Sequence, residues 1–255
     1  VADNLNKRFG TAFDAHNIIM TVGAAGGLNI IFKTILDPGD EVIVFAPYFG
    51  EYRSYAANFD ASVVEVAPDY ETFQPDLEAF AQAVRVQTKA VIVNTPNNPT
   101  GVIYHEDTMR KIGEILEAKE KEIGHEIYLI SDEPYRELVY GDVEVPYLTK
   151  YYKNTLVCYS YSKSLSLPGE RIGYVVVPDE ADDADLLIEG ITVSNRTLGF
   201  VNAPSLMQKA VARCLDEKTN LAFYDENRKM LYEGLKALGF FCIKPEGAFY
   251  MWVKS

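Results

Sequence analysis

The 255-residue sequence is poor in several residue types that define whole classes of protein. It has three cysteines, three histidines and one tryptophan. The cysteines, Cys158, Cys214 and Cys242, lie far apart and form no CxxC pair. This spacing disfavours a disulfide scaffold and favours buried free thiols in a reducing cytosol. The histidines have no HExxH spacing and no GxSxG segment occurs, so a zinc protease and a serine hydrolase have little support, and we expect no metal site.

Positive charge is also scarce. The chain has 24 lysines and arginines against 37 aspartates and glutamates, a net charge of -13. Such a surface repels nucleic acids and anionic lipids. No apolar run approaches the length of a membrane span, and the first residues show no signal-peptide pattern. We therefore expect a cytoplasmic protein that binds no nucleic acid and no membrane, and that acts on small molecules.

Both ends of the sequence suggest a piece of a longer protein. Residue 1 is a valine, and VADNLNKRFG predicts the last turns of a helix that ends at Gly10. At the other end, GAFYMWVKS (247–255) predicts a strand that stops without a partner. We expect truncation on both sides.

Short apolar runs alternate with helical stretches over most of the chain. The runs are continuous rather than alternating, which is typical of strands buried on both faces of a sheet. They cover 18–22, 41–45, 62–66, 90–94, 127–131, 156–160 and 173–177, and the helical stretches cover 24–36, about 48–58, 76–85 and 105–122. This order predicts a three-layer α/β/α fold with a mostly parallel central sheet. After Pro178 the pattern is helical, and a long amphipathic helix over about 219–238, closed by Gly239, could link two domains.

Five of these strands end in unusual polar segments. They are GAAGGL, APYF, TPNNPTG, DEPY and SYSK. Ligands of open α/β sheets bind beyond the carboxyl ends of the strands. One cofactor could explain all five segments.

The glycine-rich segment 23–27 follows a strand and opens a helix. The backbone N–H groups of Ala24 and Ala25, next to Gly23, would then face an anion at the positive end of the helix. Ser160, Ser162 and Arg171 could add hydroxyls and a bidentate guanidinium for a phosphate. A tight turn that simply needs glycine is the alternative interpretation.

Asp132 follows an apolar strand, where a buried carboxylate needs a cationic or N–H partner. It could cap a helix, or it could hold a proton on a pyridine nitrogen. Tyr135 could donate to a phenolate oxygen of the same ring or pack in the core, and Asn98 could be a turn residue. Either Phe49 or Tyr48 could stack on a flat ligand.

Lys163 supplies the remaining group. An amine beside a phosphate site and a pyridinium partner can form a Schiff base with an aldehyde. Pyridoxal 5'-phosphate is the cofactor that unites a phosphate loop, an acid on the ring nitrogen and a lysine aldimine.

The segment SYSKSLSLPGERIG (160–173) resembles the pyridoxal-phosphate attachment segment of class I/II aminotransferases. NTPNNPTG resembles the Asn-Pro-Thr-Gly segment of that family, SDEPY its Asp-x-x-Tyr segment and TVGAAGGL its phosphate loop, all in the family order. The resemblance covers the chain almost end to end. It implies the fold type I architecture of aspartate aminotransferase, with a cofactor-binding large domain over 1–217 and an interdomain helix with the start of a small α+β domain over 218–255.

The resemblance also implies residue roles. Lys163 matches the aldimine lysine and proton-transfer base, Asp132 the partner of the ring nitrogen, and Tyr135 with Asn98 the contacts of the ring hydroxyl. Phe49 matches the stacking aromatic. The phosphate ligands would be Ala24, Ala25, Ser160, Ser162 and Arg171, beside Gly23. The catalytic residues would be Lys163, Asp132 and Tyr135.

The expected function is amino-group transfer between an amino acid and a 2-oxo acid. A β-elimination C–S lyase of the same fold and a non-catalytic fragment that binds pyridoxal phosphate are the alternatives. The resemblance further implies a homodimer in the full-length form, and Arg196 falls in the region that could reach the partner's site. It places the arginine that grips the substrate carboxylate beyond Ser255.

Overall fold

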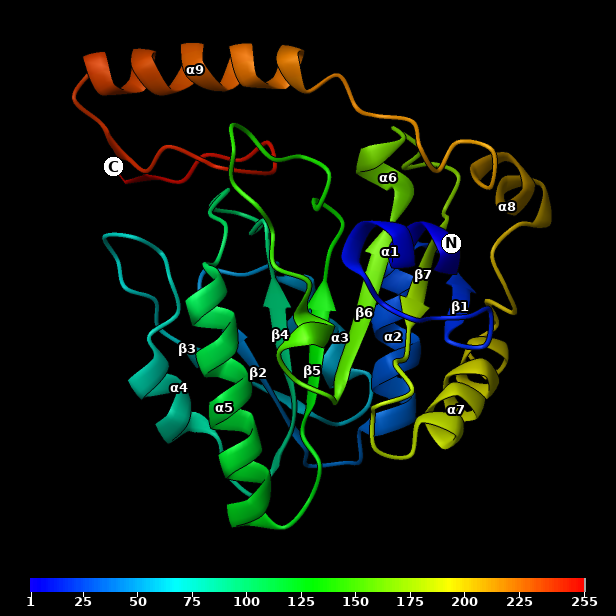
Figure 1. Cartoon of the computed structure of the whole chain (residues 1–255). Helices are drawn as coiled ribbons and strands as arrows, with labels where there is room; N and C mark the ends of the chain where they lie inside the picture. The colour runs from blue at the N-terminus through cyan, green and yellow to red at the C-terminus, as the bar shows by residue number, and fades with distance from the viewer. Residues whose placement is uncertain (255) are drawn as a thin grey trace.

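Figure 1 shows the computed structural model, which describes residues 1–254, as a central sheet covered by helices. The sheet has seven strands. The strands are β1 (Ile18–Thr21), β2 (Glu41–Phe45), β3 (Ser62–Val66), β4 (Thr88–Asn94), β5 (Tyr128–Asp132), β6 (Thr155–Ser160) and β7 (Gly173–Val176). Their order in the sheet is β1-β7-β6-β5-β4-β2-β3. Only β7 runs antiparallel to its two neighbours, β1 and β6; the pairs from β6 to β3 are parallel. The predicted mostly parallel sheet is confirmed.

The continuous apolar runs form strands because both faces of the sheet are buried. In β2, Val42 and Val44 point into one core while Ile43 and Phe45 point into another. This is the period-2 alternation of strand side chains, with apolar residues needed at every position. The four residues 42–45 are each almost fully buried.

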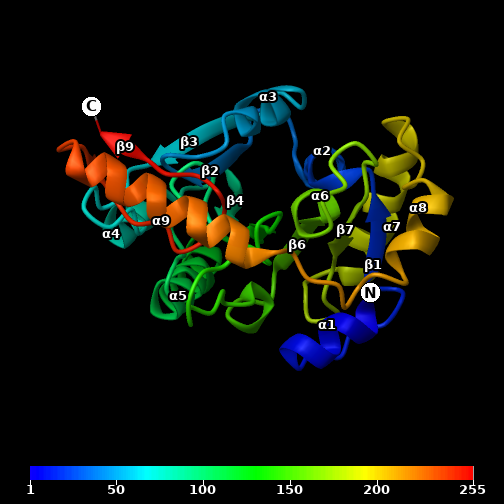
Figure 2. The same ribbon diagram turned by 90° about the horizontal axis from the view of Figure 1, so that it is seen from above.

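Helices cover both faces and give three layers (Figures 1 and 2). One core lies between the sheet and α2 (Gly23–Ile35), α3 (Glu51–Ala57) and α7 (Ala184–Thr197). On the opposite face, α4 (Leu77–Ala83) and α5 (Glu106–Ile123) pack with the 3-10 turn η1 (Leu148–Lys150) over a second core. Helices α1 (Ala2–Phe9) and α8 (Ser205–Val211) cover a third core at the β6–β7 end. The three-layer α/β/α prediction is thereby confirmed.

Most predicted helix ends agree with the structure. Helix α1 ends at Gly10, which has the left-handed φ of 68° expected for this C-terminal glycine. Helix α3 begins at Glu51, three residues later than predicted, because residues 46–50 form an irregular connection after β2. In that connection the Ala46 N–H donates to the carbonyl of Val66, which extends the sheet rather than a helix.

The C-terminal segment crosses the carboxyl ends of the strands (Figure 1). It contains α9 (Leu221–Ala237), none of whose residues is buried, and a two-stranded antiparallel sheet of β8 (Phe241–Cys242) and β9 (Val253–Lys254). The predicted strand over 247–255 is wrong for residues 247–252, and the expectation that it has no partner is wrong for residues 253–254, which pair with β8; residue 255 lies outside the described residues. Gly247 bridges to Val139 and Ala248 has a φ of 55°, so the chain turns there instead of extending.

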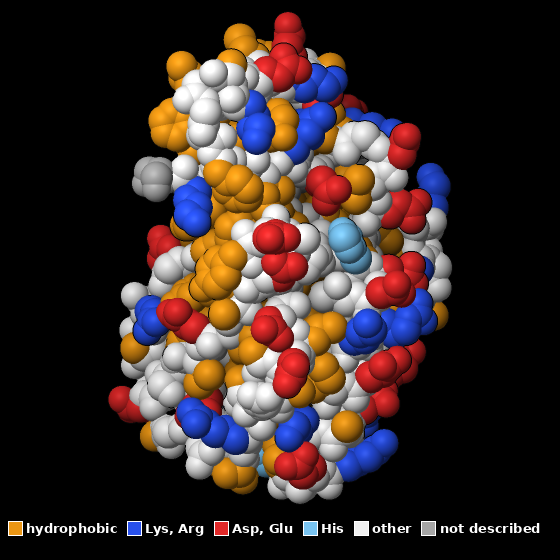
Figure 3. Space-filling view, turned by 90° about the vertical axis from the view of Figure 1, so that its left-hand side faces the viewer, with side chains coloured by type: hydrophobic (Ala, Val, Ile, Leu, Met, Phe, Trp, Pro, Cys, Tyr) orange, Lys and Arg blue, Asp and Glu red, His pale blue; other side chains and the backbone are white. Residues whose placement is uncertain are grey.

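Hydrophobic side chains remain at the surface near this segment. Figure 3 shows them gathered next to the C-terminal end of the chain. The exposed large hydrophobic residues of this segment include Leu238, Phe240, Phe241 and Trp252. Between residues 1 and 254, no helix is long and apolar enough to cross a membrane.

Candidate functional site

A pocket of about 260 Å³ opens at the carboxyl ends of β4, β5 and β6, beside the first turn of α2. This is the edge of an open α/β sheet where ligands bind. The pocket is lined by ten of the eleven residues that the sequence singles out for a cofactor: Ala24, Ala25, Phe49, Asn98, Asp132, Tyr135, Ser160, Ser162, Lys163 and Arg171. The eleventh, Gly23, directly precedes Ala24, and a Cβ on it would lie 2.8 Å from Arg171 Nη2.

Lys163 is carried by α6 (Tyr161–Ser164), a single helical turn that directly follows β6. Ser160, the last residue of β6, caps this turn and accepts a hydrogen bond from the Ser162 N–H at 3.1 Å. The Lys163 Nζ lies 5.2 Å from the ring centre of Phe249 and 5.9 Å from that of Tyr135. The amine therefore lies beside two aromatic rings at the pocket.

Asp132 ends β5 and is almost completely buried. Its Oδ2 accepts a hydrogen bond from the Tyr52 hydroxyl at 2.5 Å, whereas its Oδ1 has no hydrogen-bond partner in the structure. Burial raises the pKa of this carboxyl to about 7, although the Tyr52 hydrogen bond lowers it and the nearby Glu133 raises it further. Turn residues rather than a helix follow Asp132, so the helix-cap interpretation is wrong.

Two residues that the sequence analysis missed hold Asp132, one through its carboxylate and one through its backbone carbonyl. Tyr52 reaches it from α3, and the Asn94 amide donates to the Asp132 carbonyl at 2.9 Å from the end of β4. The Asn94 Oδ1 also accepts from the Asn98 N–H at 2.7 Å, which fixes the start of the NNPTG segment. A buried asparagine at a strand end was a signal for Asn94, because a polar side chain in that position needs partners. For Tyr52 the sequence offered no comparable signal.

Tyr135 and Asn98 lie on the same side of the pocket. The Tyr135 hydroxyl lies 2.6 Å from the hydroxyl of Tyr250, which was also missed. Burial and then the Tyr250 hydroxyl raise the pKa of Tyr135 well above its usual value, while the Asn98 side chain lowers it. Tyr135 therefore keeps its proton at neutral pH and can donate it.

Backbone and guanidinium groups form the opposite side of the pocket. Gly23 opens α2 with a φ of 81°, and a Cβ on it would lie 2.8 Å from Arg171 Nη2. Glycine is thus required both for the left-handed backbone and for the approach of the guanidinium. Arg171 itself has a φ of 50° and donates to the carbonyls of Pro168 and Val22 at 2.8 and 3.3 Å.

Of the two aromatic candidates in the APYF segment, only one lines the pocket. Phe49 lines the pocket and meets the Tyr52 ring edge-on, with ring centres 5.5 Å apart. Tyr48 instead donates its hydroxyl to Glu65 at 2.5 Å. Phe49 is therefore the aromatic placed to face a flat ligand. Arg196 lies exposed in the last turn of α7 and does not line this pocket.

The pocket offers a partner for each polar group of pyridoxal phosphate. A buried carboxylate oxygen without a partner is costly, and a protonated ring nitrogen is a group that would satisfy it. At the other end, a helix N-terminus and Arg171 provide donors for a phosphate. Lys163 lies at the same pocket with an amine for an aldehyde. The residues present fit the cofactor.

Comparison with protein families agrees with this chemistry. The family model described as "Aminotransferase class I and II" matches residues 1–255. The chain belongs to the class I and II aminotransferase family. Members of this family use pyridoxal 5'-phosphate.

Individual relatives of this aminotransferase chain carry related names. It is 33% identical over 255 residues to the probable aspartate/prephenate aminotransferase of Thermus aquaticus, and 34% identical over 257 residues to that of Aquifex aeolicus. Each match covers 98% of the chain and 64% of the relative. The chain thus spans slightly under two thirds of the length of these curated relatives.

Solved structures show the same architecture. An aminotransferase from Eubacterium rectale is 51% identical, with a TM-score of 0.98 over 100% of this chain and 64% of that one. An aspartate aminotransferase from Thermotoga maritima is 29% identical, with a TM-score of 0.87 over 100% of this chain and 66% of its own. The fold type I architecture implied by the sequence resemblance is confirmed.

Proposed function

We propose that the protein to which this chain belongs binds pyridoxal 5'-phosphate in the pocket and transfers an amino group between an amino acid and a 2-oxo acid. The observation that carries the proposal is Asp132 Oδ1, buried at the pocket without a hydrogen-bond partner. A cationic ring nitrogen would satisfy this oxygen and favour the charged carboxylate. Family membership and the names of the relatives support the same reaction class.

When bound, the cofactor supplies an aldehyde for the amino group and a conjugated ring that accepts electron density. Asp132 would hold the proton on the ring nitrogen, oriented by Tyr52 from α3. Tyr135 and Asn98 would contact the ring hydroxyl, and Phe49 would cover the ring face. Asp132 ends β5, and Asn98 and Tyr135 follow β4 and β5 within four residues, so the order of the strands brings these groups to one side of the ring.

The phosphate would bind the N–H groups of Ala24 and Ala25, the hydroxyls of Ser160 and Ser162 and the Arg171 guanidinium. In the structure the Ser160 hydroxyl donates to the Ser162 Oγ at 2.7 Å, so the two hydroxyls lie at one point of the pocket. The positive end of α2 adds to the attraction for a dianion.

Lys163 would act first as a nucleophile toward an aldehyde and then as the group that moves a proton at the substrate α-carbon. Its Nζ is the one lysine amine at this pocket among the described residues. The rings of Phe249 and Tyr135 beside it limit the access of water to the amine, which favours controlled proton transfer.

Substrates, partners and compartment also belong to this proposal. Relatives named for aspartate and prephenate favour an amino acid and a 2-oxo acid as substrates. We propose a homodimer in which Arg196, exposed on α7, is available to a neighbouring site.

The domain division at 217/218 and the cytosolic location stay predictions. The β-elimination alternative gains no support, because the relatives are named aminotransferases.

Trapping the lysine tests the cofactor site directly. The chain is incubated with pyridoxal 5'-phosphate and reduced with borohydride: the amine and aldehyde condense with loss of water, and hydride reduces the C=N bond to a stable amine. We expect peptide mass mapping to find the adduct on Lys163. The Lys163→Ala variant should lose it, whereas Lys236→Ala, at the exposed end of α9, should keep it. An adduct of equal yield in Lys163→Ala would refute the site.

Turnover needs a separate assay. The protein expressed from its whole coding sequence is supplied with aspartate and a panel of 2-oxo acids, and the new amino acid is measured. We expect Asp132→Asn to keep bound cofactor while losing turnover by at least about a hundredfold, since the neutral amide cannot stabilise a charged ring nitrogen. Unchanged turnover in this variant would contradict the role of Asp132.

A further inference from the structure

The helical turn α6 that carries Lys163 has little stability of its own. It contains four residues, and a single turn does not repay the cost of helix nucleation in isolation. Its last carbonyls also lack partners within the helix. The orientation of Lys163 must therefore depend on contacts between α6 and the rest of the protein.

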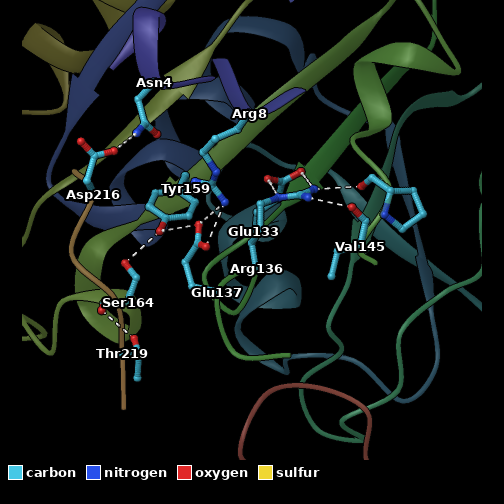
Figure 4. A network of polar contacts seen from close by, with 11 residues as sticks. Asn4, Arg8, Glu133, Arg136, Glu137, Val145, Tyr159, Ser164, Asp216 and Thr219 are labelled. Atoms are coloured by element: carbon cyan, nitrogen blue, oxygen red, sulfur yellow. Dashed lines mark hydrogen bonds and ion pairs between the residues drawn. The ribbon is translucent and has the colours of Figure 1, made fainter. Parts of the chain in front are cut away.

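Ser164, the residue after Lys163, makes two such contacts (Figure 4). Its Oγ accepts a hydrogen bond from the Tyr159 hydroxyl at 2.8 Å, and its carbonyl accepts one from Thr219 Oγ1 at 2.7 Å. Ser164 is itself buried. Both contacts lie outside the cofactor pocket, because neither Ser164 nor Tyr159 lines it.

Tyr159 connects this turn to the segment that carries the other site residues. Its hydroxyl also faces Glu137 Oε1 at 3.4 Å, and Glu137 is paired with Arg8 of α1 at 2.8 and 2.9 Å (Figure 4). Glu137 lies two residues after Tyr135, in the irregular segment that follows Asp132.

The Tyr159 ring is held firmly enough to act as a fixed donor. It stacks on Tyr174 with ring centres 4.9 Å apart and an interplanar angle of 18°, and it meets Tyr161 edge-on. Along β6, Tyr159 points to the face opposite that of Cys158 and belongs to the core under α1. Burial and the charge of Glu137 raise the pKa of Tyr159 well above its usual value, so the hydroxyl keeps its proton at neutral pH.

We propose that Tyr159 and Ser164 are positioning residues for Lys163: the contact between their hydroxyls fixes the turn α6 so that the amine points into the pocket. The inference rests on the proposed function, since it assigns these residues to the delivery of the lysine amine. It also explains why a tyrosine outside the pocket contacts the residue directly after the lysine. Neither residue touches the cofactor, and both act through Lys163.

Two ligands that differ in one group distinguish a misplaced Lys163 amine from a general loss of cofactor binding. Pyridoxal 5'-phosphate carries the aldehyde that traps Lys163, while pyridoxine 5'-phosphate carries an alcohol and only binds. The test uses the protein expressed from its whole coding sequence. For Tyr159→Phe and Ser164→Ala we expect the rate of reducible adduct formation on Lys163 to fall about tenfold, because small misplacement of a reacting group is costly. The dissociation constant for pyridoxine 5'-phosphate should stay within about twofold of the wild type.

Matched variants complete the design. Tyr174→Phe removes a hydroxyl from the same aromatic stack, and that hydroxyl makes no hydrogen bond among the described residues. It should leave the adduct rate unchanged. Ser164→Thr keeps the Oγ and should restore the rate, since cavities of about 420 and 620 Å³ beside Ser164 leave room for the methyl group.

Each other outcome overturns the inference. If the adduct rate and the pyridoxine 5'-phosphate affinity fall together, or if neither changes, the two hydroxyls do not position Lys163. The same holds if Tyr174→Phe slows the adduct as much as Tyr159→Phe. A wild-type protein that forms no adduct on Lys163 would instead reject the proposed function, so the two failures are distinguishable.

Discussion

The hydroxyl of Tyr52 and the carboxylate of Asp132 lie 2.5 Å apart, although 80 residues separate them in the chain. Tyr52 belongs to α3 on one face of the sheet, and Asp132 is the last residue of the central strand β5. Both side chains are almost fully buried. The tyrosine satisfies one carboxylate oxygen and leaves the other free toward the pocket, so it determines which oxygen is available to a ligand.

Replacing Tyr52 by phenylalanine should weaken cofactor binding. The change removes the hydrogen bond that lowers the pKa of Asp132, so the carboxyl becomes harder to ionise. A hydrogen bond to a charged group contributes about 1.5–3 kcal/mol, which corresponds to roughly ten- to a hundredfold in affinity. Fluorescence titration with pyridoxal 5'-phosphate measures the effect. Tyr55→Phe, on the same helix, is the control, because no hydrogen bond of its hydroxyl is found in the described chain. If Tyr52→Phe binds pyridoxal 5'-phosphate as tightly as the wild type, Tyr52 does not support the charged form of Asp132.

Relative to the Asp132→Asn variant, the cofactor-free protein should lose stability as the pH rises from about 4 to 7. Burial raises the pKa of Asp132 from 3.8 to about 7, so over this window the folded chain retains a proton that the unfolded chain loses. The stability that this proton supplies is complete below pH 4 and is lost by about pH 7, and its size is on the order of 4 kcal/mol. Asp132→Asn removes the titration. Thermal unfolding of the two proteins should match near pH 4, and the variant should be the more stable at pH 8. If the difference in stability between the two proteins is the same at pH 4 and at pH 8, the pKa of Asp132 is not raised.

Much of this site could be predicted from the sequence because its residues occur at strand ends in short local segments. Lys163 with Arg171, and Asp132 with Tyr135, lie close together in the chain and follow apolar strands. Parallel strands place such ends at one edge of the sheet whatever the details of packing. The pocket lining therefore follows from the order of strands alone.

Tyr52 and Tyr250 could not be found in this way. The side of α3 that faces the sheet depends on how this short helix is rotated about its axis when it packs. The sequence does not give that rotation. Tyr250 was assigned to a strand because residues 247–255 are mostly apolar. In the structure, a Cβ on Gly247 would lie 2.6 Å from the Pro96 side chain and 2.9 Å from the Leu138 carbonyl, so close approach of the backbone rather than strand pairing directs this segment.

Gly23→Ala should damage the phosphate end of the pocket selectively. The new Cβ would lie 2.8 Å from Arg171 Nη2, and the φ of 81° disfavours any side chain. Gly124→Ala is a matched control: its φ is 83°, and a Cβ there meets nothing within 4 Å. Both variants should lose roughly 1 kcal/mol of stability from the left-handed backbone. Only Gly23→Ala should also lose affinity for pyridoxal 5'-phosphate, by about tenfold or more, in the same titration. An equal loss of affinity in the two variants would show that the guanidinium contact is irrelevant.

Arg136 and Glu133 form a buried ion pair directly after Asp132, and it should be a main support of the site (Figure 4). Arg136 also donates to the carbonyls of Val145 and Pro146 at 3.0 and 2.9 Å. Arg136→Met would leave the Glu133 carboxylate buried without its cation, which costs about 3–5 kcal/mol.

Urea unfolding followed by circular dichroism measures this loss. The double variant Glu133→Gln/Arg136→Met removes both charges and should recover part of the stability, because the cost lies in the unpaired charge rather than in the lost attraction. Arg110→Met breaks an exposed pair with Glu106 on α5 and should cost no more than about 0.5 kcal/mol. If the double variant is as unstable as Arg136→Met, the hydrogen bonds of Arg136 to the 145–146 segment, and not its charge, hold the chain beyond Asp132 in place.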